Sequence, residues 1–138
     1  MAKISPIKLK LDVKGAETTV DVSYEITFDK KDQDAKQKYE EMCRLMGDDT
    51  DTGDPPAAGG DDTLGFLTPM FTTDTAAKGK DRVARHFTKK FRTADLDEDR
   101  AQIPNPDEFR ALVTLTPLPR GSGAAIKRES PVVKRKIG

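Results

Sequence analysis

Residues 7–28, IKLKLDVKGAETTVDVSYEITF, decide the fold, because two alternating stretches flank a glycine. The first stretch places apolar residues at every second position, namely Ile7, Leu9, Leu11 and Val13. The second does the same over Val20, Val22, Tyr24, Ile26 and Phe28. A strand puts such a set on one face, whereas a helix scatters it around its circumference. The sequence therefore predicts two strands here, either as a hairpin or as neighbours in two sheets.

The C-terminal third repeats this alternation. Phe109–Thr116 reads as a strand with Phe109, Ala111, Val113 and Leu115 on one face, and Pro117 and Pro119 are expected to end it. A short apolar piece follows at 124–126, and Val132–Ile137 is expected to form a last strand.

Two central stretches are ambiguous between helix and strand. Over 35–46, Tyr39, Cys43 and Met46 fit helical spacing, yet a strand with Tyr39, Cys43 and Leu45 inward would bring Glu41 onto the same face. The stretch 82–92 has the same ambiguity. Because the surrounding rhythm is strand-like and broken by turn clusters, we predict strands at both, with a short helix near 35–46 as the alternative.

These patterns predict an all-β fold. About seven strand-like segments in 138 residues favour a single antiparallel β-sandwich domain spanning residues 1–138. The segment 47–62 is rich in Gly, Asp, Pro and Ala, and we expect it to be a mobile acidic loop.

The stretch 107–115, DEFRALVTL, resembles the turn-into-strand segment late in immunoglobulin-like domains. There an acidic residue precedes an alternating apolar strand. The sequence departs from that pattern because Ala111 stands at the place of the corner tyrosine and Val113 at that of the disulfide cysteine. The resemblance implies an immunoglobulin-like sandwich and implies no function.

Composition excludes several classes of protein. Val, Ile, Leu and Phe make up about a fifth of the chain, and the formal net charge is zero. No stretch is long and apolar enough for a membrane helix, and Met1–Leu11 lacks a signal-like apolar block. The single cysteine, Cys43, cannot form an internal disulfide, so we expect a cytoplasmic protein, although a chain already stripped of its signal would look the same.

The acidic loop suggests a cation site. Asp49, Asp51 and Asp54 resemble half of a calcium loop, since Ca²⁺ prefers several carboxylate oxygens and a glycine at the turn. Glycine is the fifth residue of this run and Gly60 the twelfth, so the run is not an EF-hand. A Ca²⁺-dependent binding domain that uses this acidic rim is therefore the alternative functional hypothesis.

Other chemistry is weakly supported. The run from Lys78 to Arg92 is basic and contains Phe87 and Phe91, but the neutral chain as a whole argues against nucleic-acid binding. Cys43 and His86 are each the only residue of their kind, and no nucleophile or phosphate-loop motif is present. We expect a protein that is not an enzyme and holds no cofactor other than the Ca²⁺ of the alternative.

The most apolar run, 64–71, contains Phe66, Met70 and Phe71. It reads either as a core strand bent at Pro69 or as a partly exposed edge that docks a protein partner. The leading hypothesis is thus a structural or protein–protein interaction module, with a homodimer as one form. Residues 29–62 carry a net charge of −6 and residues 78–92 carry +6, which predicts self-association that salt weakens.

Overall fold

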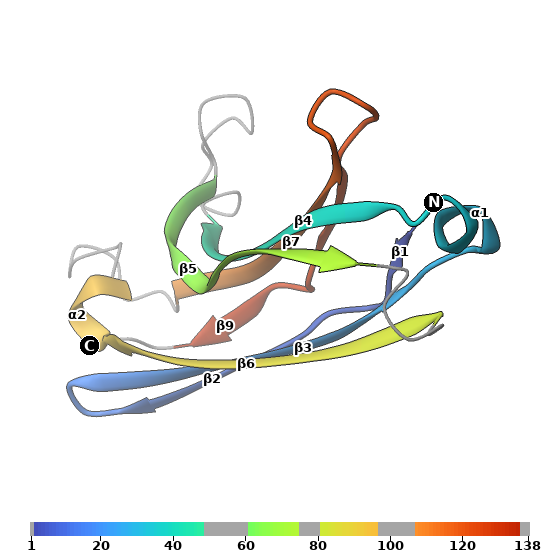
Figure 1. Ribbon diagram of the computed structural model, residues 1–138. Coiled ribbons are helices and arrows are strands. Elements are labelled where there is room, and N and C mark those ends of the chain that lie inside the picture. The colour runs from blue at the N-terminus through green and yellow to red at the C-terminus, as the bar shows by residue number, and fades with distance from the viewer. Residues whose placement is uncertain (1, 49–60, 75–80, 97–106, 136–138) are drawn as a thin grey trace.

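The computed structural model describes residues 2–48, 61–74, 81–96 and 107–135. Two antiparallel sheets form two layers with the apolar core between them (Figure 1). The all-β antiparallel sandwich predicted from the sequence is confirmed. These residues form nine strands where about seven were expected, and in this part of the chain no helix is long and apolar enough to cross a membrane.

The first sheet contains the N-terminal strands and one strand from the middle of the chain. Its members are β1 (Lys3–Ile4), β2 (Lys8–Lys14), β3 (Glu17–Thr27) and β6 (Arg82–Arg92). β3 is central: it pairs with β1 and β2 on one side and with β6 on the other. β6 was one of the two ambiguous stretches, and its strand prediction is confirmed.

The second sheet has the order β5-β4-β7-β8, and β9 also pairs with β7. Its strands are β4 (Lys38–Asp48), β5 (Asp61–Asp74), β7 (Asp107–Leu118), β8 (Ile126–Glu129) and β9 (Val133–Arg135). β4 and β7 pair continuously from Lys38↔Leu118 to Gly47↔Phe109. They form the middle of this sheet.

The predicted N-terminal strands form a hairpin. Lys14 pairs with Glu17 across a two-residue turn, in which Gly15 has φ 60°, a conformation that glycine adopts without steric cost. The alternating apolar set of β3 is buried as expected, with Val20 and Ile26 inaccessible to solvent. The hairpin therefore presents one apolar face to the core.

From Lys38 onward the stretch 35–46 is a strand, as predicted, and the short helix expected near this stretch comes directly before it. A short helix, α1 (Lys30–Asp34), lies before it and is capped by Asp29, whose Oδ1 accepts the Asp32 backbone N–H at 2.8 Å. β4 is hydrogen-bonded to β5 on one side and to β7 on the other, and this double pairing favours the strand over the local helical spacing. Glu41 is fully buried on its inward face.

The edges of four predicted segments need correction. Gly47–Asp48 and Asp61–Asp62 belong to β4 and β5, so the strands extend into the expected 47–62 loop, whose residues 49–60 lie outside the described part. β7 continues through Pro117 to Leu118. The described part of the last strand is Val133–Arg135, which begins one residue later than expected, and residues 136–138 lie outside the described part. The 124–126 piece contributes only Ile126, at the start of β8.

Several buried ionisable groups keep their protons to high pH. Burial, and then the negative charge of Glu41, raises the pKa of Cys43 to about 12. Burial, and then a hydrogen bond from its hydroxyl to Asp32 at 3.0 Å, raises the pKa of Tyr39 to about 12. Burial also raises the pKa of Tyr24, helped by its hydrogen bond to Glu41. The folded state therefore binds more protons than the unfolded chain at alkaline pH.

We predict that the free energy of unfolding falls as pH rises from about 9 to about 12. The unfolded thiol loses its proton near 9.0 and the unfolded tyrosine near 10.0, whereas folded Cys43 and Tyr39 lose theirs only near 12. Urea titrations at half-unit pH steps measure this slope. Cys43→Ala should flatten it between pH 9 and 10, and Tyr39→Phe only above 10. A stability that stays level over this range would contradict the prediction.

Candidate functional site

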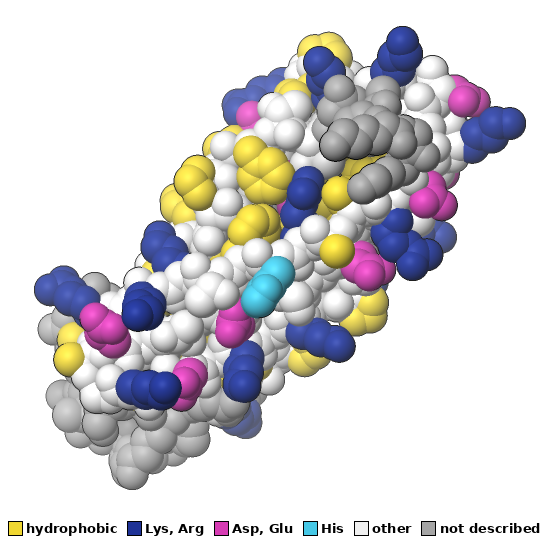
Figure 2. Space-filling model, turned by 60° about the horizontal axis from the view of Figure 1, so that its bottom comes forward, with side chains coloured by type: hydrophobic (Ala, Val, Ile, Leu, Met, Phe, Trp, Pro, Cys, Tyr) yellow, Lys and Arg dark blue, Asp and Glu magenta, His cyan; other side chains and the backbone are white. Residues whose placement is uncertain are grey.

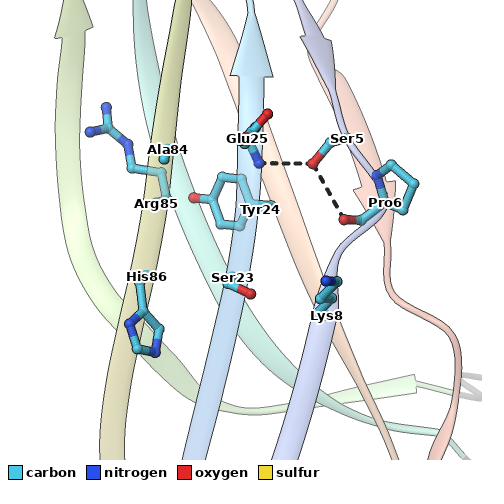
Figure 3. Close-up of a pocket in the computed structure, with 9 residues that line it drawn as sticks. All are labelled: Ser5, Pro6, Lys8, Ser23, Tyr24, Glu25, Ala84, Arg85 and His86. Atoms are coloured by element: carbon cyan, nitrogen blue, oxygen red, sulfur yellow. Dashed lines mark hydrogen bonds between the residues drawn. The ribbon is translucent and has the colours of Figure 1, made fainter.

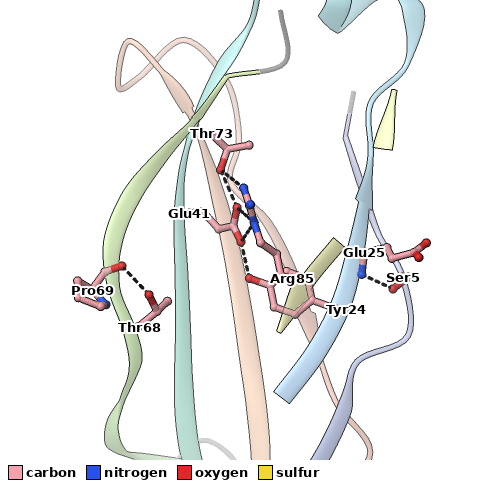
Figure 4. Close-up of polar contacts among 8 residues, drawn as sticks. All are labelled: Ser5, Tyr24, Glu25, Glu41, Thr68, Pro69, Thr73 and Arg85. Atoms are coloured by element: carbon pink, nitrogen blue, oxygen red, sulfur yellow. Dashed lines mark hydrogen bonds and ion pairs between the residues drawn. The ribbon is translucent and has the colours of Figure 1, made fainter. Parts of the chain in front are cut away.

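A buried polar cluster joins the two sheets. Glu41 of β4 is inaccessible to solvent, and side chains from three other strands surround its carboxylate: Tyr24 of β3, Thr73 of β5 and Arg85 of β6 (Figure 4). We call these four residues the Glu41 cluster. Because β3 and β6 belong to one sheet and β4 and β5 to the other, the cluster connects both layers.

Each carboxylate oxygen of Glu41 has donors. Thr73 Oγ1 donates to Oε1 at 2.7 Å, and the Tyr24 hydroxyl donates to Oε2. Arg85 Nε lies 3.2 Å from Oε2 and 3.3 Å from Oε1, and Arg85 Nη2 donates to Thr73 Oγ1 at 3.0 Å. A buried carboxylate is tolerated only with such charge-assisted partners. The sequence pattern gave Glu41 as the misfit on the β4 face, and that misfit is the signal that locates the cluster.

Arg85 connects the Glu41 cluster to partly exposed side chains. Its guanidinium lies over the ring of Phe71, 5.0 Å from the centroid, and its side chain is 21% exposed. Phe71 in turn packs edge-on against Phe87, with centroids 6.1 Å apart. The Glu41 cluster therefore fixes β5 against β6 at Phe71.

The predicted interaction residues lie on β5, an edge strand. In the described part of the chain β5 pairs only with β4. Phe66 is 48% and Met70 49% exposed, and no other large hydrophobic side chain in that part is so exposed. Leu67, between them, is buried. β5 is thus both a core strand and a partly exposed edge, and we call Phe66, Met70 and the half-buried Phe71 the β5 strip.

A hollow of about 450 Å³ lies beside the β5 strip. β5 residues from Phe66 to Met70 form one wall, and Thr88 and Lys89 of β6 form the other. Figure 2 shows hydrophobic side chains, interrupted by Lys and Arg, gathered on the surface near the single histidine, His86. The hollow opens where the edges of the two sheets meet.

β5 and β6 approach closely at one end of this hollow. A Cβ on Gly65 would lie 2.7 Å from Cε1 of Phe91, so only glycine fits the present packing. Lys89 Nζ donates to the Phe66 carbonyl at 2.8 Å and lies 5.3 Å from the Phe91 ring centroid. These contacts hold the two edge strands side by side.

A second, larger hollow of about 620 Å³ lies over the first sheet and brings Ser23 and His86 together (Figure 3). The two residues face each other across β3 and β6, but the Ser23 hydroxyl turns away from the imidazole. His86 Nε2 instead lies 2.8 Å from Asp21 Oδ1, and hydrogen bonds first from Thr88 and then from His86 hold the pKa of Asp21 below its ordinary value. The arrangement is a surface hydrogen-bond network and not a nucleophile–base pair.

The other candidates from the sequence do not come together. Cys43 is fully buried on β4, whereas His86 is exposed on the outer face of β6. The ring of Phe87 packs against Tyr24 as well as Phe71, so it is occupied within the protein and does not alternate with the cations as a free stacking surface.

The calcium residues Asp49, Asp51 and Asp54 lie outside the described residues, so the cation hypothesis stays a prediction of the sequence. Among the residues that the structure does describe, no group of three or more His, Cys, Asp or Glu side chains is arranged to hold a metal ion.

Comparison with known protein-family models, with curated proteins and with solved structures finds no match to this chain. The fold defines the class, an antiparallel two-sheet sandwich, and the site must be judged on its own geometry.

We predict that Arg85→Met destabilises the fold by about 3 kcal/mol, because it leaves the buried Glu41 carboxylate without its charged partner. Adding Glu41→Gln to that variant should recover part of the loss. Arg82→Met is the matched control, since Arg82 is a largely exposed residue of the same strand and should change stability by less than about 0.5 kcal/mol. Equal urea midpoints for Arg85→Met and Arg82→Met would contradict this role for Arg85.

Proposed function

We propose that this protein is a non-enzymatic protein–protein interaction module that binds through the β5 strip. The observation that carries the proposal is the exposure of Phe66 and Met70 on one edge strand, beside a hollow of about 450 Å³. Phenylalanine and methionine are enriched in the buried centres of interfaces, where they fill or flank pockets. Their exposure raises the free energy of the unbound protein, and a partner that covers them removes that cost.

The surroundings of the β5 strip favour specific binding over non-specific hydrophobic association. Phe71 is fixed by the Arg85 guanidinium and by Phe87, so one side of the strip is already rigid before a partner arrives. Rigid anchors lose little conformational entropy on binding. Lys89 at the rim contributes positive charge and so favours a partner with acidic groups near its apolar contacts.

We also propose that the sandwich is immunoglobulin-like. In immunoglobulin domains the first, second, fourth and fifth strands share one sheet, and the third, sixth and seventh share the other. Here β2, β3 and β6 share a sheet, as do β4, β7 and the pieces β8 and β9, with β5 beside β4. Apart from β5, which lies beside β4 and not in the first sheet, this order supports the resemblance first seen at Asp107–Leu115.

The test removes the two exposed side chains of the β5 strip and leaves Phe71 in place. Phe66→Ser with Met70→Ser should leave the urea midpoint almost unchanged, because both side chains are about half exposed. A display library of random linear peptides is selected on the native protein, and each enriched peptide is measured by calorimetry. We expect affinities to fall at least tenfold for the double variant. Lys8→Ser, an exposed change on β2, serves as the control and should bind as the native protein does.

Two results would contradict the proposal. One is a set of enriched peptides that bind the double variant as tightly as the native protein. The other is a failure to enrich any peptide, together with a mass by light scattering that shows a monomer at every concentration and ionic strength. A dimer that the double variant abolishes would instead identify the partner as a second copy of this chain.

A further inference from the structure

Beside the β5 strip lies a second surface feature, the outer edge of β6. β6 pairs with β3 at all eleven positions from Arg82↔Thr27 to Arg92↔Glu17, with no bulge, glycine or proline. Among the described residues no strand pairs with its other edge. A long, regular and unpaired edge presents a row of backbone donors and acceptors to an incoming strand.

The backbone groups that point outward can be assigned. Glu25 accepts a hydrogen bond from the Ser5 backbone N–H and donates its own N–H to Ser5 Oγ, both at 2.8 Å, so both its groups turn away from β6. Directions alternate along an antiparallel strand, so Tyr24 and its partner Arg85 bond to each other. The N–H and C=O groups of Ala84, His86, Thr88 and Lys90 therefore point to the free edge.

The neighbouring edge of β5 is protected against the same kind of pairing. Pro69 has no N–H to offer, and the Phe66 carbonyl already accepts from Lys89 Nζ. The pairing of β5 with β4 is also interrupted by three register shifts, all of which lie between Glu41 and Met46 of β4. Of the two edges that meet at the hollow, only β6 offers an uninterrupted ladder.

Charge selects the occupant of this edge. β6 carries Arg82, Arg85, Lys89, Lys90 and Arg92 and no acidic residue. Arg85 is paired with Glu41, but the other cations of two copies of β6 laid edge to edge would repel one another, which is destabilising. An extended segment with acidic side chains on the outer face, beside Lys90 and Arg82, has the complementary charge. On its inner face the same segment would meet the hollow and the exposed Phe66 and Met70.

We infer that β6 accepts, as an added strand, an extended segment of a partner protein in which acidic and apolar residues alternate. The inference rests on the proposed interaction function and names the partner's chemistry. Main-chain hydrogen bonds to the free edge of β6 supply affinity, and the alternating side chains supply specificity. The added strand covers the β5 strip with its apolar face.

The test uses a seven-residue peptide that alternates glutamate and valine, with blocked ends. Hydrogen exchange followed by NMR should slow at least tenfold for the amides of Ala84, His86, Thr88 and Lys90 when the peptide saturates the protein. The amides of Arg85 and Phe87, which already bond to β3, should change little. This alternation is the signature of an added strand, and a merely apolar contact would not produce it.

Thr88→Pro removes one outward N–H, and proline is tolerated where the N–H of an edge strand faces away from the sheet. Thr88→Val is the matched control, because both variants lose the hydroxyl that donates to Asp21 at 2.5 Å. We expect the peptide to bind Thr88→Pro about tenfold more weakly than Thr88→Val, the effect of one hydrogen bond. Circular dichroism and the urea midpoint verify that both variants fold.

The charge requirement is tested with two further peptides. One replaces every glutamate with lysine, and the other keeps the composition but groups the valines at one end. Neither should bind, and rising salt should weaken the binding of the glutamate–valine peptide.

Three outcomes would overturn the inference. They are equal binding of the peptide by Thr88→Pro and Thr88→Val, uniform protection of the amides along β6, and binding of the lysine peptide. Loss of binding in Phe66→Ser with Met70→Ser would still uphold the proposed function, so the two failures are distinguishable. A second copy of this chain as occupant would appear as a dimer that Thr88→Pro dissociates, and this would overturn the charge argument.

Discussion

The buried carboxylate of Glu41 is the constraint on which the arrangement of the two sheets depends. A charge in the core is tolerated only if donors converge on it, and here they come from β3, β5 and β6 at once. The cluster therefore sets how β5 and β6 lie across the open side of the sandwich. The cluster also holds the Arg85 guanidinium over the ring of Phe71, so the partner of the buried carboxylate also fixes a side chain of the β5 strip.

The open side of the sandwich contains two edge strands with opposite properties. β5 exposes apolar side chains but protects its backbone with Pro69 and with the contact from Lys89 to the Phe66 carbonyl. β6 packs its partly buried Val83, Phe87 and Phe91 against the core, and no strand among the described residues pairs with its outer edge. One edge thus exposes apolar side chains and the other exposes backbone groups, and the strand addition proposed above would use both.

The strands with strict alternation were predictable because a single rule, burial of one face, governs them. The strands β2, β3 and β7 follow directly from the alternation over 7–13, 20–28 and 109–115, although their pairing does not. The stretch 35–46 resisted the same rule because Glu41 stands among the inward residues. Its burial depends on donors from distant segments, such as Arg85, forty-four positions away. No local pattern can contain that information.

The sequence by itself determined the all-β class, the positions of the long strands and the apolar run that contains Phe66, Met70 and Phe71. These follow from local periodicity and composition, which act over a few residues. Only the tertiary structure decided that Glu41, Tyr24, Thr73 and Arg85 meet, and that Phe66 and Met70 are exposed while Leu67 is buried. It also decided that, in the described part of the chain, no strand pairs with the outer edge of β6. The physical reason is that sheet order and side-chain compensation arise from pairing between segments far apart in the chain.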